Sequence, residues 1–356
     1  MKRRARDPQR GSVRGRPAVC LLGWVTAALA VLAIAAPAGA EAPGPSDGPQ
    51  GAAPAAMAVA RRGPRRAEPA VATPEFRPEG LGAASAILVD ATSGDILFSH
   101  GAQERRAPAS LTKVMTAVIV LERANLSDQV VASPRVREAG GHIMGLRPGQ
   151  RLSVYDLLSA LLVLSANDAA VALAEHVGGS VAGFADLMNA KAQALGMQDT
   201  SFRNPHGLDA PEHYSTAYDL AVLTRYALQS PTFAQIVRTR QTVITVKNPA
   251  QRRRRAATVS RVLRSHNRLL TAFEGADGVK TGFTNEAGRC LVASAQRDGR
   301  RIIAVLLNDP RRWEDAASLL EYGFMLLGAP AATRAAAPGG LAPPPRFAPD
   351  SPQVGG

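Results

Sequence analysis

Short strand patterns at both ends of a helical block limit the possible folds of this chain more than any other feature. Apolar β-type runs at 86–90 and 96–98 flank the turn-forming segment 91–95, which is typical of a hairpin. Further strand patterns lie at 242–246, 278–280, 290–295 and 302–307, and helical patterns begin at Ser110 and cover 154–164, 168–177, 181–195, 219–228 and 314–327. This order predicts an α/β (α+β) fold, in which an antiparallel sheet is flanked by helices and interrupted by a mostly helical insertion.

The two ends of the chain differ from this patterned part in composition. Residues 41–79 consist largely of Ala, Pro, Gly and Arg with almost no large apolar side chains, and residues 329–356 are again rich in Ala, Pro and Gly. Such segments bury too little apolar surface to offset the conformational entropy that is lost on folding. We therefore expect a disordered linker at 41–79, a folded domain at 80–328 and a disordered tail at 329–356.

The first forty residues have the pattern of an export signal. They carry seven Lys or Arg and one Asp, followed by an apolar run from 18 to 36 and the small-residue ending Ala38-Gly39-Ala40. This order is typical of a secretory signal that is removed after Ala40, although the run is also near the shortest length that spans a membrane as an uncleaved anchor. We expect cleavage, and a location in the periplasmic or cell-wall space.

The chain is strongly basic and uses very little cysteine. Its formal net charge is +13, and removal of residues 1–40 would leave +7, which suits a polyanionic wall or membrane surface but also serves solubility. The run from Arg252 to Arg255 is expected on a solvated loop and is a candidate for weak contact with such a surface. Cys20 falls within the predicted signal, so Cys290 would remain alone and form no intramolecular disulfide. We predict no metal, no cofactor and no nucleic-acid partner.

Ser110 and Lys113 form the first of three short motifs that carry chemistry. Ser110 is a favoured residue at a helix start, and the apolar spacing that follows it is that of a buried helix. Residues three apart on a helix share one face, so the Lys113 amine is within reach of the Ser110 hydroxyl. A hydroxyl becomes a good nucleophile when a base takes its proton, and a buried lysine that loses its charge is such a base.

Two further stretches raise the specificity of this pattern. Ser165-Ala166-Asn167 follows an apolar helical run, and Lys280-Thr281-Gly282 follows Gly275-Ala276-Asp277-Gly278. The chain contains only five lysines among 42 Lys and Arg, and two of the five are Lys113 and Lys280. Arginine stays charged at working pH and could not serve as a base, so lysine at these positions has a chemical reason.

The order S-x-x-K, S-x-N, K-T-G resembles that of the serine-type D-alanyl-D-alanine carboxypeptidases, the low-molecular-weight penicillin-binding proteins. The resemblance extends over residues 80–328 and includes several further stretches, namely Asp168-Ala169-Ala170, Asn204-Pro205-His206-Gly207-Leu208-Asp209, Tyr214-Ser215-Thr216-Ala217, Asp219-Leu220 and Asn267-Arg268-Leu269-Leu270. It implies an antiparallel sheet flanked by helices with an all-helical subdomain. It also implies an enzyme that acts on peptidoglycan stem peptides and is inhibited covalently by β-lactams.

The resemblance assigns the first two motifs to acyl transfer. Ser110 would attack the carbonyl of the D-Ala-D-Ala bond with Lys113 as its base, and the cation of Lys280 would lower the proton affinity of Lys113. Ser165 would relay a proton to the leaving amine, and Asn167 would hydrogen-bond Lys113 or the substrate amide. These four residues, Ser110, Lys113, Ser165 and Asn167, are the predicted catalytic set.

The third motif would bind the substrate. Lys280 and Thr281 offer donors to the terminal carboxylate, and Gly282 would leave room for the substrate along the strand edge. Backbone N–H groups of Ser110 and Phe283 would form the oxyanion hole, by resemblance to the family. Phe283 replaces the His that some relatives carry, which affects side-chain roles at this position but not the N–H group.

Three functions other than a carboxypeptidase are alternatives for this sequence. A class A β-lactamase shares S-x-x-K but needs a Glu-x-x-Leu-Asn loop, and Glu175, Glu212 and Glu274 all lack the following Leu-Asn. A D,D-endopeptidase that cuts cross-links uses the same residues and stays an alternative. A catalytically silent wall-binding protein is the alternative of another class. Lys280 and Thr281 favour the carboxypeptidase, because a free carboxylate binds cationic donors more strongly than an internal amide does.

Four other polar residues near the motifs are not assigned to catalysis. His206 and His213 are predicted to be structural turn residues, since no Asp partner can be assigned to either. Arg311 or Arg312 could assist in binding the carboxylate, but neither is included in the predicted site.

Overall fold

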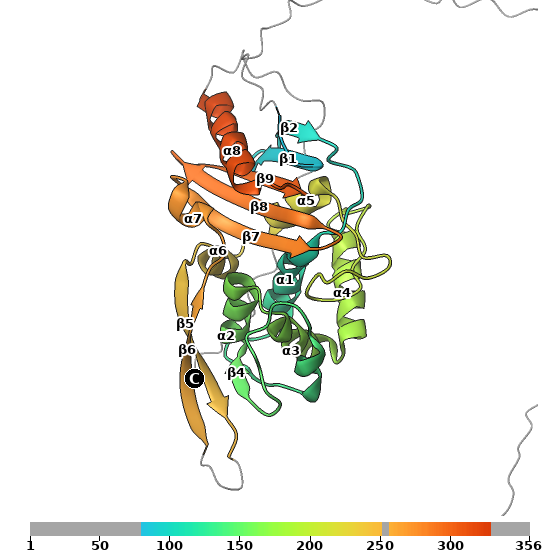
Figure 1. The fold of residues 1–356 in the computed structure, drawn as a ribbon, viewed down its shortest axis with the longest axis vertical. Helices are drawn as coiled ribbons and strands as arrows, with labels where there is room; N and C mark the ends of the chain where they lie inside the picture. Colours follow the sequence, from blue (N-terminus) through green and yellow to red (C-terminus); the bar gives the residue numbers. More distant parts are fainter. Residues whose placement is uncertain (1–79, 251–255, 329–356) are drawn as a thin grey trace, which may run out of the picture. The chain divides into compact units, whose positions relative to one another are not determined.

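The computed structural model describes residues 80–250 and 256–328 (Figure 1). The predicted export signal, linker and tail lie outside the described residues, as does the run from Arg252 to Arg255. The predictions for those segments therefore stay predictions.

Five antiparallel strands form the main sheet, and the first and last strands of the described chain lie side by side in it (Figure 1). The strands are β1 (Ser85–Asp90), β2 (Ile96–His100), β7 (Ala276–Thr284), β8 (Gly288–Arg297) and β9 (Arg300–Leu307), in the order β2-β1-β9-β8-β7. β1 and β2 make the predicted hairpin, and β1 pairs with β9 from Ser85 opposite Leu307 to Asp90 opposite Ile302. β7 lies at the edge of the sheet, so one side of its backbone has no strand partner.

Helices cover both faces of this sheet, and its central strands are therefore buried on both sides. All six residues of β1 are buried. Leu88 belongs to the apolar cluster under α8 (Arg312–Gly328), whereas its neighbour Ile87 belongs to the cluster that contains α5 (Ala217–Ala227). Successive strand residues point to opposite faces, so the two helices lie on opposite sides of the sheet.

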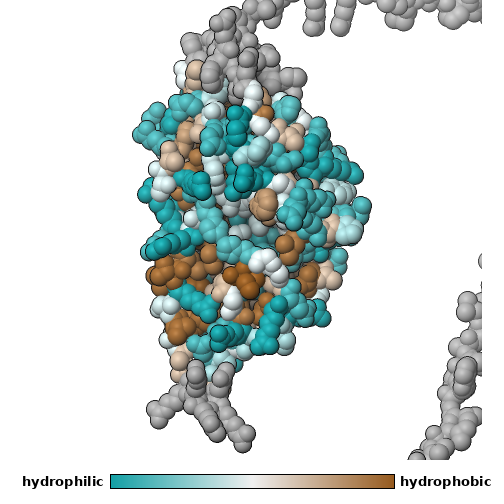
Figure 2. Space-filling model, in the orientation of Figure 1, coloured by the Kyte–Doolittle hydropathy of each residue, from teal (hydrophilic) through white to brown (hydrophobic). Residues whose placement is uncertain are grey.

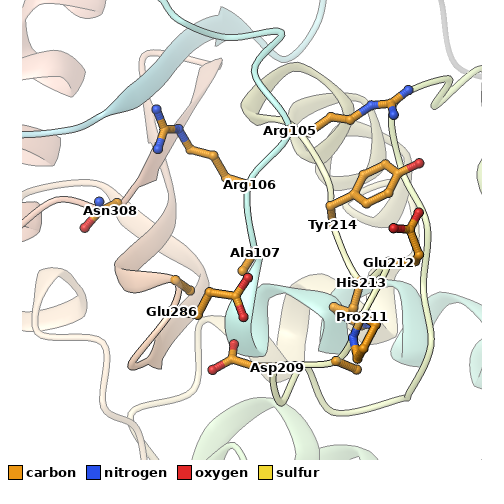
Figure 3. A pocket seen from close by; sticks show the side chains of 12 residues that line it. Arg105, Arg106, Ala107, Asp209, Pro211, Glu212, His213, Tyr214, Glu286 and Asn308 are labelled. Carbon is orange, nitrogen blue, oxygen red and sulfur yellow. The ribbon is translucent and has the colours of Figure 1, made fainter.

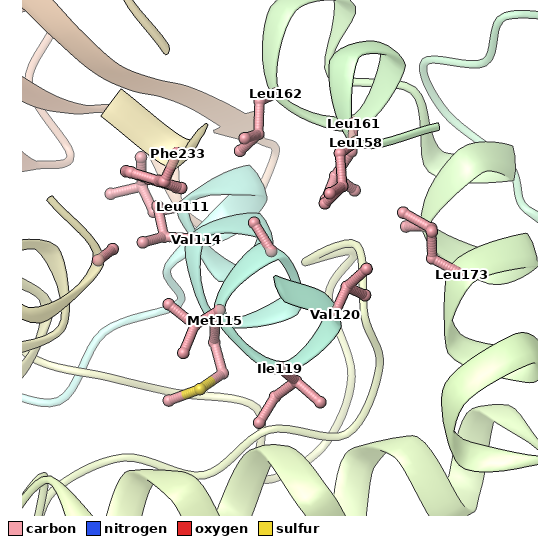
Figure 4. Packing of buried hydrophobic residues seen from close by; sticks show 14 of the residues in the cluster. Leu111, Val114, Met115, Ile119, Val120, Leu158, Leu161, Leu162, Leu173 and Phe233 are labelled. Atoms are coloured by element: carbon pink, nitrogen blue, oxygen red, sulfur yellow. The ribbon is translucent and has the colours of Figure 1, made fainter. Parts of the chain in front are cut away.

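The helix that follows Ser110 is the centre of the helical part. Every residue of α1 (Lys113–Arg123) from Lys113 to Leu121 is buried. Figure 4 shows its apolar side chains among residues such as Leu158, Leu173 and Phe233. A helix that is enclosed on all sides belongs to the core, and the charged side chain of Lys113 is therefore enclosed as well.

Most of the helices around α1 begin at a Ser or Thr that caps them. These helices are α2 (Val154–Ser159), the π-helical turn η3 (Ala160–Leu164), α3 (Asn167–Gly178), α4 (Val181–Ala194) and α6 (Pro231–Val237), of which η3 and α3 have no side-chain cap. The hydroxyls of Ser153, Ser180, Thr216 and Ser230 each accept a backbone N–H three residues further on, at the starts of α2, α4, α5 and α6. The predicted helices at 154–164, 168–177, 181–195, 219–228 and 314–327 are confirmed to within a few residues.

A second antiparallel sheet lies against the helical part, and only one of its strands was predicted. Its order is β3-β4-β5-β6, with β3 (Gln129–Val131), β4 (Arg151–Ser153), β5 (Gln241–Asn248) and β6 (Ala257–Arg264). The strand at 242–246 corresponds to β5. β3 and β4 have three residues each, which is too short to show a period of two, and β6 is mostly exposed.

The outer face of the β5–β6 ribbon exposes some apolar surface. Val243 lies opposite Val262, and they are 57% and 56% exposed. Figure 2 shows apolar side chains gathered over the end of the molecule that holds these strands. Within the described ranges, no helix combines the length and the apolar character needed to cross a membrane.

Candidate active site

Ser110 lies in a tight turn just before the central helix. The 3₁₀ turn η1 (Ala109–Thr112) precedes α1, and no side chain caps either of them. The prediction that Ser110 starts the helix is therefore confirmed in position, but its hydroxyl is not used as a cap. The hydroxyl instead lies 2.8 Å from the Lys113 amine.

The Lys113 amine has three polar partners, and only one of them is able to donate a hydrogen bond. Nζ lies 2.7 Å from Oδ1 of Asn167, 2.7 Å from the carbonyl oxygen of His206 and 2.8 Å from Oγ of Ser110. An ammonium donates three hydrogen bonds, whereas a neutral amine donates two and keeps a lone pair. The two oxygens of Asn167 and His206 accept only. The lone pair of a neutral Lys113 therefore faces the Ser110 hydroxyl.

The surroundings of Lys113 favour this neutral form. Its side chain is completely buried, and burial lowers the pKa of Lys113 well below its usual value, with the charge of Lys280 as a second cause. The effect of Lys280 has the predicted direction, although burial contributes more. Burial and the nearby Arg312 lower the pKa of Lys280 itself to about 7.

The second motif reaches Lys113 through a break between two helical segments. The chain leaves η3 at Ser165, whose φ of 65° and ψ of 30° are left-handed, and enters α3 at Asn167. The Asn167 backbone N–H donates to the carbonyl oxygen of His142 at 2.7 Å, and its Nδ2 donates to that of Gly140 at 2.9 Å. These contacts turn Oδ1 of Asn167 toward Lys113.

The segment Asn204-Pro205-His206-Gly207-Leu208-Asp209 packs against η1 and the start of α1. We call η1, which carries Ser110, the nucleophile turn. Besides the carbonyl of His206, which accepts from Lys113, the carbonyl of Pro205 accepts from Thr116 Oγ1 at 2.6 Å. Gly207 has a φ of +87°, and a Cβ there would lie 1.8 Å from the Ala109 carbonyl oxygen. Only glycine fits this position, which holds the backbone next to Ser110.

The two histidines of this region are structural, as predicted. Nε2 of His213 lies 2.9 Å from Thr112 Oγ1, and its Nδ1 accepts the backbone N–H of Arg203 at 2.9 Å. Nδ1 of His206 accepts the backbone N–H of Leu208 at 3.2 Å. Burial lowers the pKa of His206 to about 3 and that of His213 to about 4, so both rings are neutral at physiological pH.

The third motif lies on the free edge of β7, which packs against η1. Lys280 is 2% exposed, and its amine donates to the carbonyl oxygen of Thr281 at 2.8 Å. Phe283 is 60% exposed. A Cβ at Gly282 would lie 3.0 Å from the Cβ of Ala109 and 3.3 Å from the Pro108 carbonyl oxygen, so glycine also eases the packing of β7 against the turn that carries Ser110. The predicted role of Gly282 in leaving room for substrate stays a prediction.

The three motifs surround one cavity of about 660 Å³. Its lining consists of Ser110, Gly141, His142, Ser165, Ser265, His266, Arg268, Thr281, Gly282, Phe283, Arg312 and Trp313. The other three predicted site residues, Lys113, Asn167 and Lys280, are buried behind this lining. The structure thus brings all eight predicted residues together.

Sequence reasoning gave no role to Arg268 or Trp313, which line the cavity, and named Arg312 only as a possible aid in binding the carboxylate. Arg268 and Arg312 lie 6.0 Å and 4.8 Å from the ring centre of Trp313. Arg312 donates to the carbonyl oxygens of Gly282 and Cys290 at 2.7 Å and 3.1 Å, while its buried Nε has no hydrogen-bond partner among the described residues. Arg268 belongs to the family-like stretch Asn267-Arg268-Leu269-Leu270, so the sequence does contain a signal for it.

A second cavity, of about 680 Å³, holds none of the motif residues (Figure 3). It lies between the β7–β8 turn, which contributes Glu286, and the segment from Asp209 to Tyr214. A hydrogen bond of 2.6 Å between Thr284 Oγ1 and Asp209 joins these two parts. Its Arg105 is already paired with Asp199 at 2.7 Å. The predicted motifs therefore belong to the cavity of Ser110, although the second one is slightly larger.

Metal-ligating and acidic side chains near the site are known for the described residues only. No group of three or more His, Cys, Asp or Glu side chains among these residues is placed to hold a metal ion. The residues that line the Ser110 cavity include no Asp or Glu. Cys290, the one cysteine among the described residues, is buried and unpaired, and burial raises the pKa of its thiol to about 11.

Comparison with known proteins gives a consistent family match. The family model described as D-alanyl-D-alanine carboxypeptidase, Peptidase S11, matches residues 71–311. D-alanyl-D-alanine carboxypeptidase DacF of Bacillus subtilis is 36% identical over 250 residues, which are 68% of this chain and 62% of the relative. DacB2 of Mycobacterium tuberculosis is 35% identical over 67% of this chain and 81% of its own. The chain thus spans about six tenths of the length of DacF.

Solved structures agree with the sequence matches. The Streptomyces K15 DD-transpeptidase is matched with a TM-score of 0.65 and 30% identity, over 72% of this chain and 100% of that one. The D-alanyl-D-alanine carboxypeptidase DacD of Francisella tularensis is matched with a TM-score of 0.62 and 32% identity, over 70% of this chain and 72% of that one. The predicted fold class is confirmed.

Proposed function

Because this chain belongs to the Peptidase S11 family of D-alanyl-D-alanine carboxypeptidases, we propose that it removes the terminal D-Ala of peptidoglycan pentapeptides through an acyl-enzyme. One observation carries the proposal. The buried Lys113 amine lies 2.8 Å from the Ser110 hydroxyl, and its two other partners accept only. This arrangement prepares a neutral base beside a nucleophile.

The first half of the reaction forms the acyl-enzyme. Oγ of Ser110 attacks the carbonyl carbon of the penultimate D-Ala, and its proton passes to Nζ of Lys113. The carbonyl oxygen takes up negative charge, which backbone N–H groups of Ser110 and Phe283 stabilise in the role assigned to them by family resemblance. The bond to the terminal D-Ala then breaks, and Ser165, which lines the same cavity, relays the proton from Lys113 to the leaving nitrogen, so that Lys113 is neutral again.

The second half releases the shortened peptide. A water molecule attacks the Ser110 ester and gives a proton to Lys113, and Lys113 returns that proton to Ser110 Oγ as the ester bond breaks, which restores the hydroxyl. Covalent catalysis is faster because it replaces one difficult hydrolysis by two easier acyl transfers. β-Lactams follow the first half and leave a covalent ester on Ser110, so the same chemistry supports inhibition by penicillins.

The cationic end of the cavity would hold the terminal carboxylate of the substrate. Thr281 lines the cavity, Lys280 lies just behind it, and Arg268 and Arg312 flank Trp313 nearby. Charged donors bind a carboxylate more strongly than neutral ones. This feature favours the carboxypeptidase over a D,D-endopeptidase. The lack of a carboxylate in the described lining also argues against a β-lactamase, which needs one to activate the deacylating water.

A single pair of assays tests the proposal. Purified protein is incubated with a labelled penicillin and, separately, with a stem pentapeptide, and acylation and free D-Ala are measured. We expect one acylated site at Ser110 and steady release of D-Ala. Absence of both would leave the silent wall-binding protein as the better description, and acylation without D-Ala release would favour an endopeptidase.

The place of action is also part of the proposal. A peptidoglycan substrate requires export, which the pattern of residues 1–40 supports, and the arginines from 252 to 255 would add weak attraction to an anionic wall or membrane surface. The intact mass of the secreted protein tests the first point, with cleavage after Ala40 as the expected result.

A further inference from the structure

The second sheet packs one face on the helical part and exposes the other. Ile244, Val246 and Leu263 are buried in the same apolar cluster as the helices around α1. Successive strand residues point to opposite faces, so their neighbours in β5 and β6 point away from the helices. We call this side the outer face. The register of the four strands places on it the side chains of Val131, Arg151, Val243, Lys247, Val262 and Arg264.

Three cations of the outer face lack acidic partners. Arg151 lies opposite Lys247, and Arg264 lies at the other end, opposite Gln241, to whose side chain it donates at 3.2 Å. All three cations are exposed, and none forms an ion pair with a described residue. Like charges directly opposite each other destabilise a sheet. The pair of Arg151 and Lys247 therefore favours an anion bound between or above them.

The same sign of charge extends along this part of the chain. From residue 220 to residue 273 the sequence contains eleven Lys or Arg and no Asp or Glu. A long segment with a single sign of charge attracts a partner of the opposite sign. A second copy of the chain would bring cations against cations, so the outer face is poorly suited to self-association. Its partner is expected to be anionic.

Apolar side chains lie among these cations. Val131, Val243 and Val262 are 50%, 57% and 56% exposed. Val243 and Val262 lie opposite each other, between the row of Lys247 and the row of Arg264. A hydrated polyanion gains from the cations but not from exposed valines. A bilayer surface accepts both, because apolar side chains enter the acyl boundary while Lys and Arg contact the phosphate headgroups.

We infer that the outer face of the second sheet docks on a bilayer with anionic phospholipid headgroups. The three valines would enter the boundary between headgroups and acyl chains, and Arg151, Lys247 and Arg264 would contact the phosphates. Docking of this kind lies on the membrane surface and spans nothing. The inference does not depend on the chemistry of Ser110, so it is separate from the proposed function.

Docking would also place the Ser110 cavity. Ser265 and His266 follow β6 directly, and both line that cavity. Val262 is three residues before Ser265, which corresponds to about 10 Å along a strand. A bilayer in contact with Val262 is therefore close to the cavity. Substrates anchored near the membrane surface would then be within reach of Ser110.

The test measures binding of the purified protein to lipid vesicles. The vesicles contain phosphatidylglycerol mixed with phosphatidylcholine, and vesicles of phosphatidylcholine alone serve as the comparison. We expect binding to the anionic vesicles that weakens as salt is added, because salt screens exposed charges. Hydrogen exchange of the β5 and β6 amides, with and without vesicles, is the second readout. It is local to the sheet, so it stays informative if the apolar run at 18–36 is retained and binds lipid itself.

Two double variants separate charge from apolar contact. Arg151→Gln with Lys247→Gln should bind the anionic vesicles about 25-fold more weakly, at about fivefold for each cation. Its melting temperature should stay equal or rise, because the repulsion across the strands is relieved. Val243→Thr with Val262→Thr keeps β-branched residues in the strands and should weaken binding by about tenfold.

Matched controls lie outside the second sheet. Arg137→Gln in η2 (Pro134–Glu138) removes an exposed cation, and Met325→Gln in α8 removes a side chain that is 44% exposed. Both should bind vesicles like the unaltered protein. The arginines from 252 to 255 lie outside the described residues and are kept in every variant. Binding that is unchanged in both double variants would overturn the inference.

The other outcomes are equally decisive. Equal binding to both kinds of vesicle, or β5 and β6 amides without protection, would overturn the inference. A loss in the cation variant alone, with the valine variant unchanged, would indicate attraction to any polyanion, such as a wall polymer, and would refute docking on lipid. Acylation by labelled penicillin should be equal in all variants. Failure of acylation in the unaltered protein would refute the proposed function without affecting this inference.

Discussion

Oδ1 of Asn167 lies 2.7 Å from Nζ of Lys113, although the two residues belong to different motifs and different helices. Nδ2 of Asn167 is engaged with the Gly140 carbonyl, so the side-chain amide has one orientation and offers only an acceptor to the amine. Together with the His206 carbonyl, it directs both N–H bonds of a neutral Lys113 away from Ser110. The fold therefore determines in which direction the lone pair of neutral Lys113 points, and not only where the amine lies.

Replacing this amide by a carboxylate should abolish the neutral base. Asn167→Asp places a negative charge next to Lys113, which raises the pKa of Lys113 and keeps it protonated. We expect penicillin acylation at pH 7 to fall by about 10²-fold, within the usual contribution of general base catalysis. The loss should shrink as the pH is raised. Asn125→Asp, at an exposed site, is the control, and an Asn167→Asp protein with the original pH profile would contradict the role given to this contact.

The nucleophile and its base should each be indispensable. Ser110→Ala should lower turnover by on the order of 10³-fold or more, since residues that act as a unit are lost together. Lys113→Arg should be nearly as damaging, because a guanidinium does not deprotonate at working pH. The exposed Lys247→Arg on β5 is the matched control. Mass spectrometry after exposure to benzylpenicillin measures the outcome, and normal acylation of Lys113→Arg would remove Lys113 as the base.

The pH dependence should have an alkaline limb that belongs to Lys280. The pKa of Lys280 is lowered to about 7, so its cationic form, which attracts the carboxylate, prevails below that pH and is lost above it. Neutral Lys113 has the opposite dependence, because its fraction grows as the pH rises through its lowered pKa. The profile of kcat/KM should therefore be bell-shaped. In Lys280→Arg the alkaline limb should move to higher pH, and an unmoved limb would assign it to another group.

The support beneath the nucleophile turn should be sensitive to a single methyl group. Gly207→Ala places a Cβ 1.8 Å from the Ala109 carbonyl oxygen at a φ of +87°, so the backbone must shift. We expect a loss of about 3 kcal/mol or more in the free energy of unfolding, together with weaker acylation. Gly196→Ala also has a positive φ, +75°, but nothing lies within 4 Å. It should cost only about 1 kcal/mol. Equal losses in denaturant unfolding would show that the close contact is unimportant.

Features that depend on neighbouring residues were determined by the sequence itself. The run of α8 carries the helical period because one face of it is buried, whereas β1 and α1 are apolar along nearly their whole length because they are buried on all sides. The spacing of Ser110 and Lys113 belongs to the same class, since a distance of three residues in a helical turn brings the two side chains together. A chemical constraint could also be read from the sequence, because lysine stands at positions where arginine, which stays charged at working pH, could not serve as a base.

Features that join distant segments were decided only by the tertiary structure. The partners that orient Lys113 lie on α3 and on the segment of His206, and neither spacing nor periodicity relates those segments to α1. β3 and β4 have three residues each, too few to show a pattern, and they exist because β5 and one another complete their hydrogen bonds. The meeting of His142 with His266 follows from how two loops pack across a cavity. Residue order alone fixes which groups are available, and packing decides which of them touch.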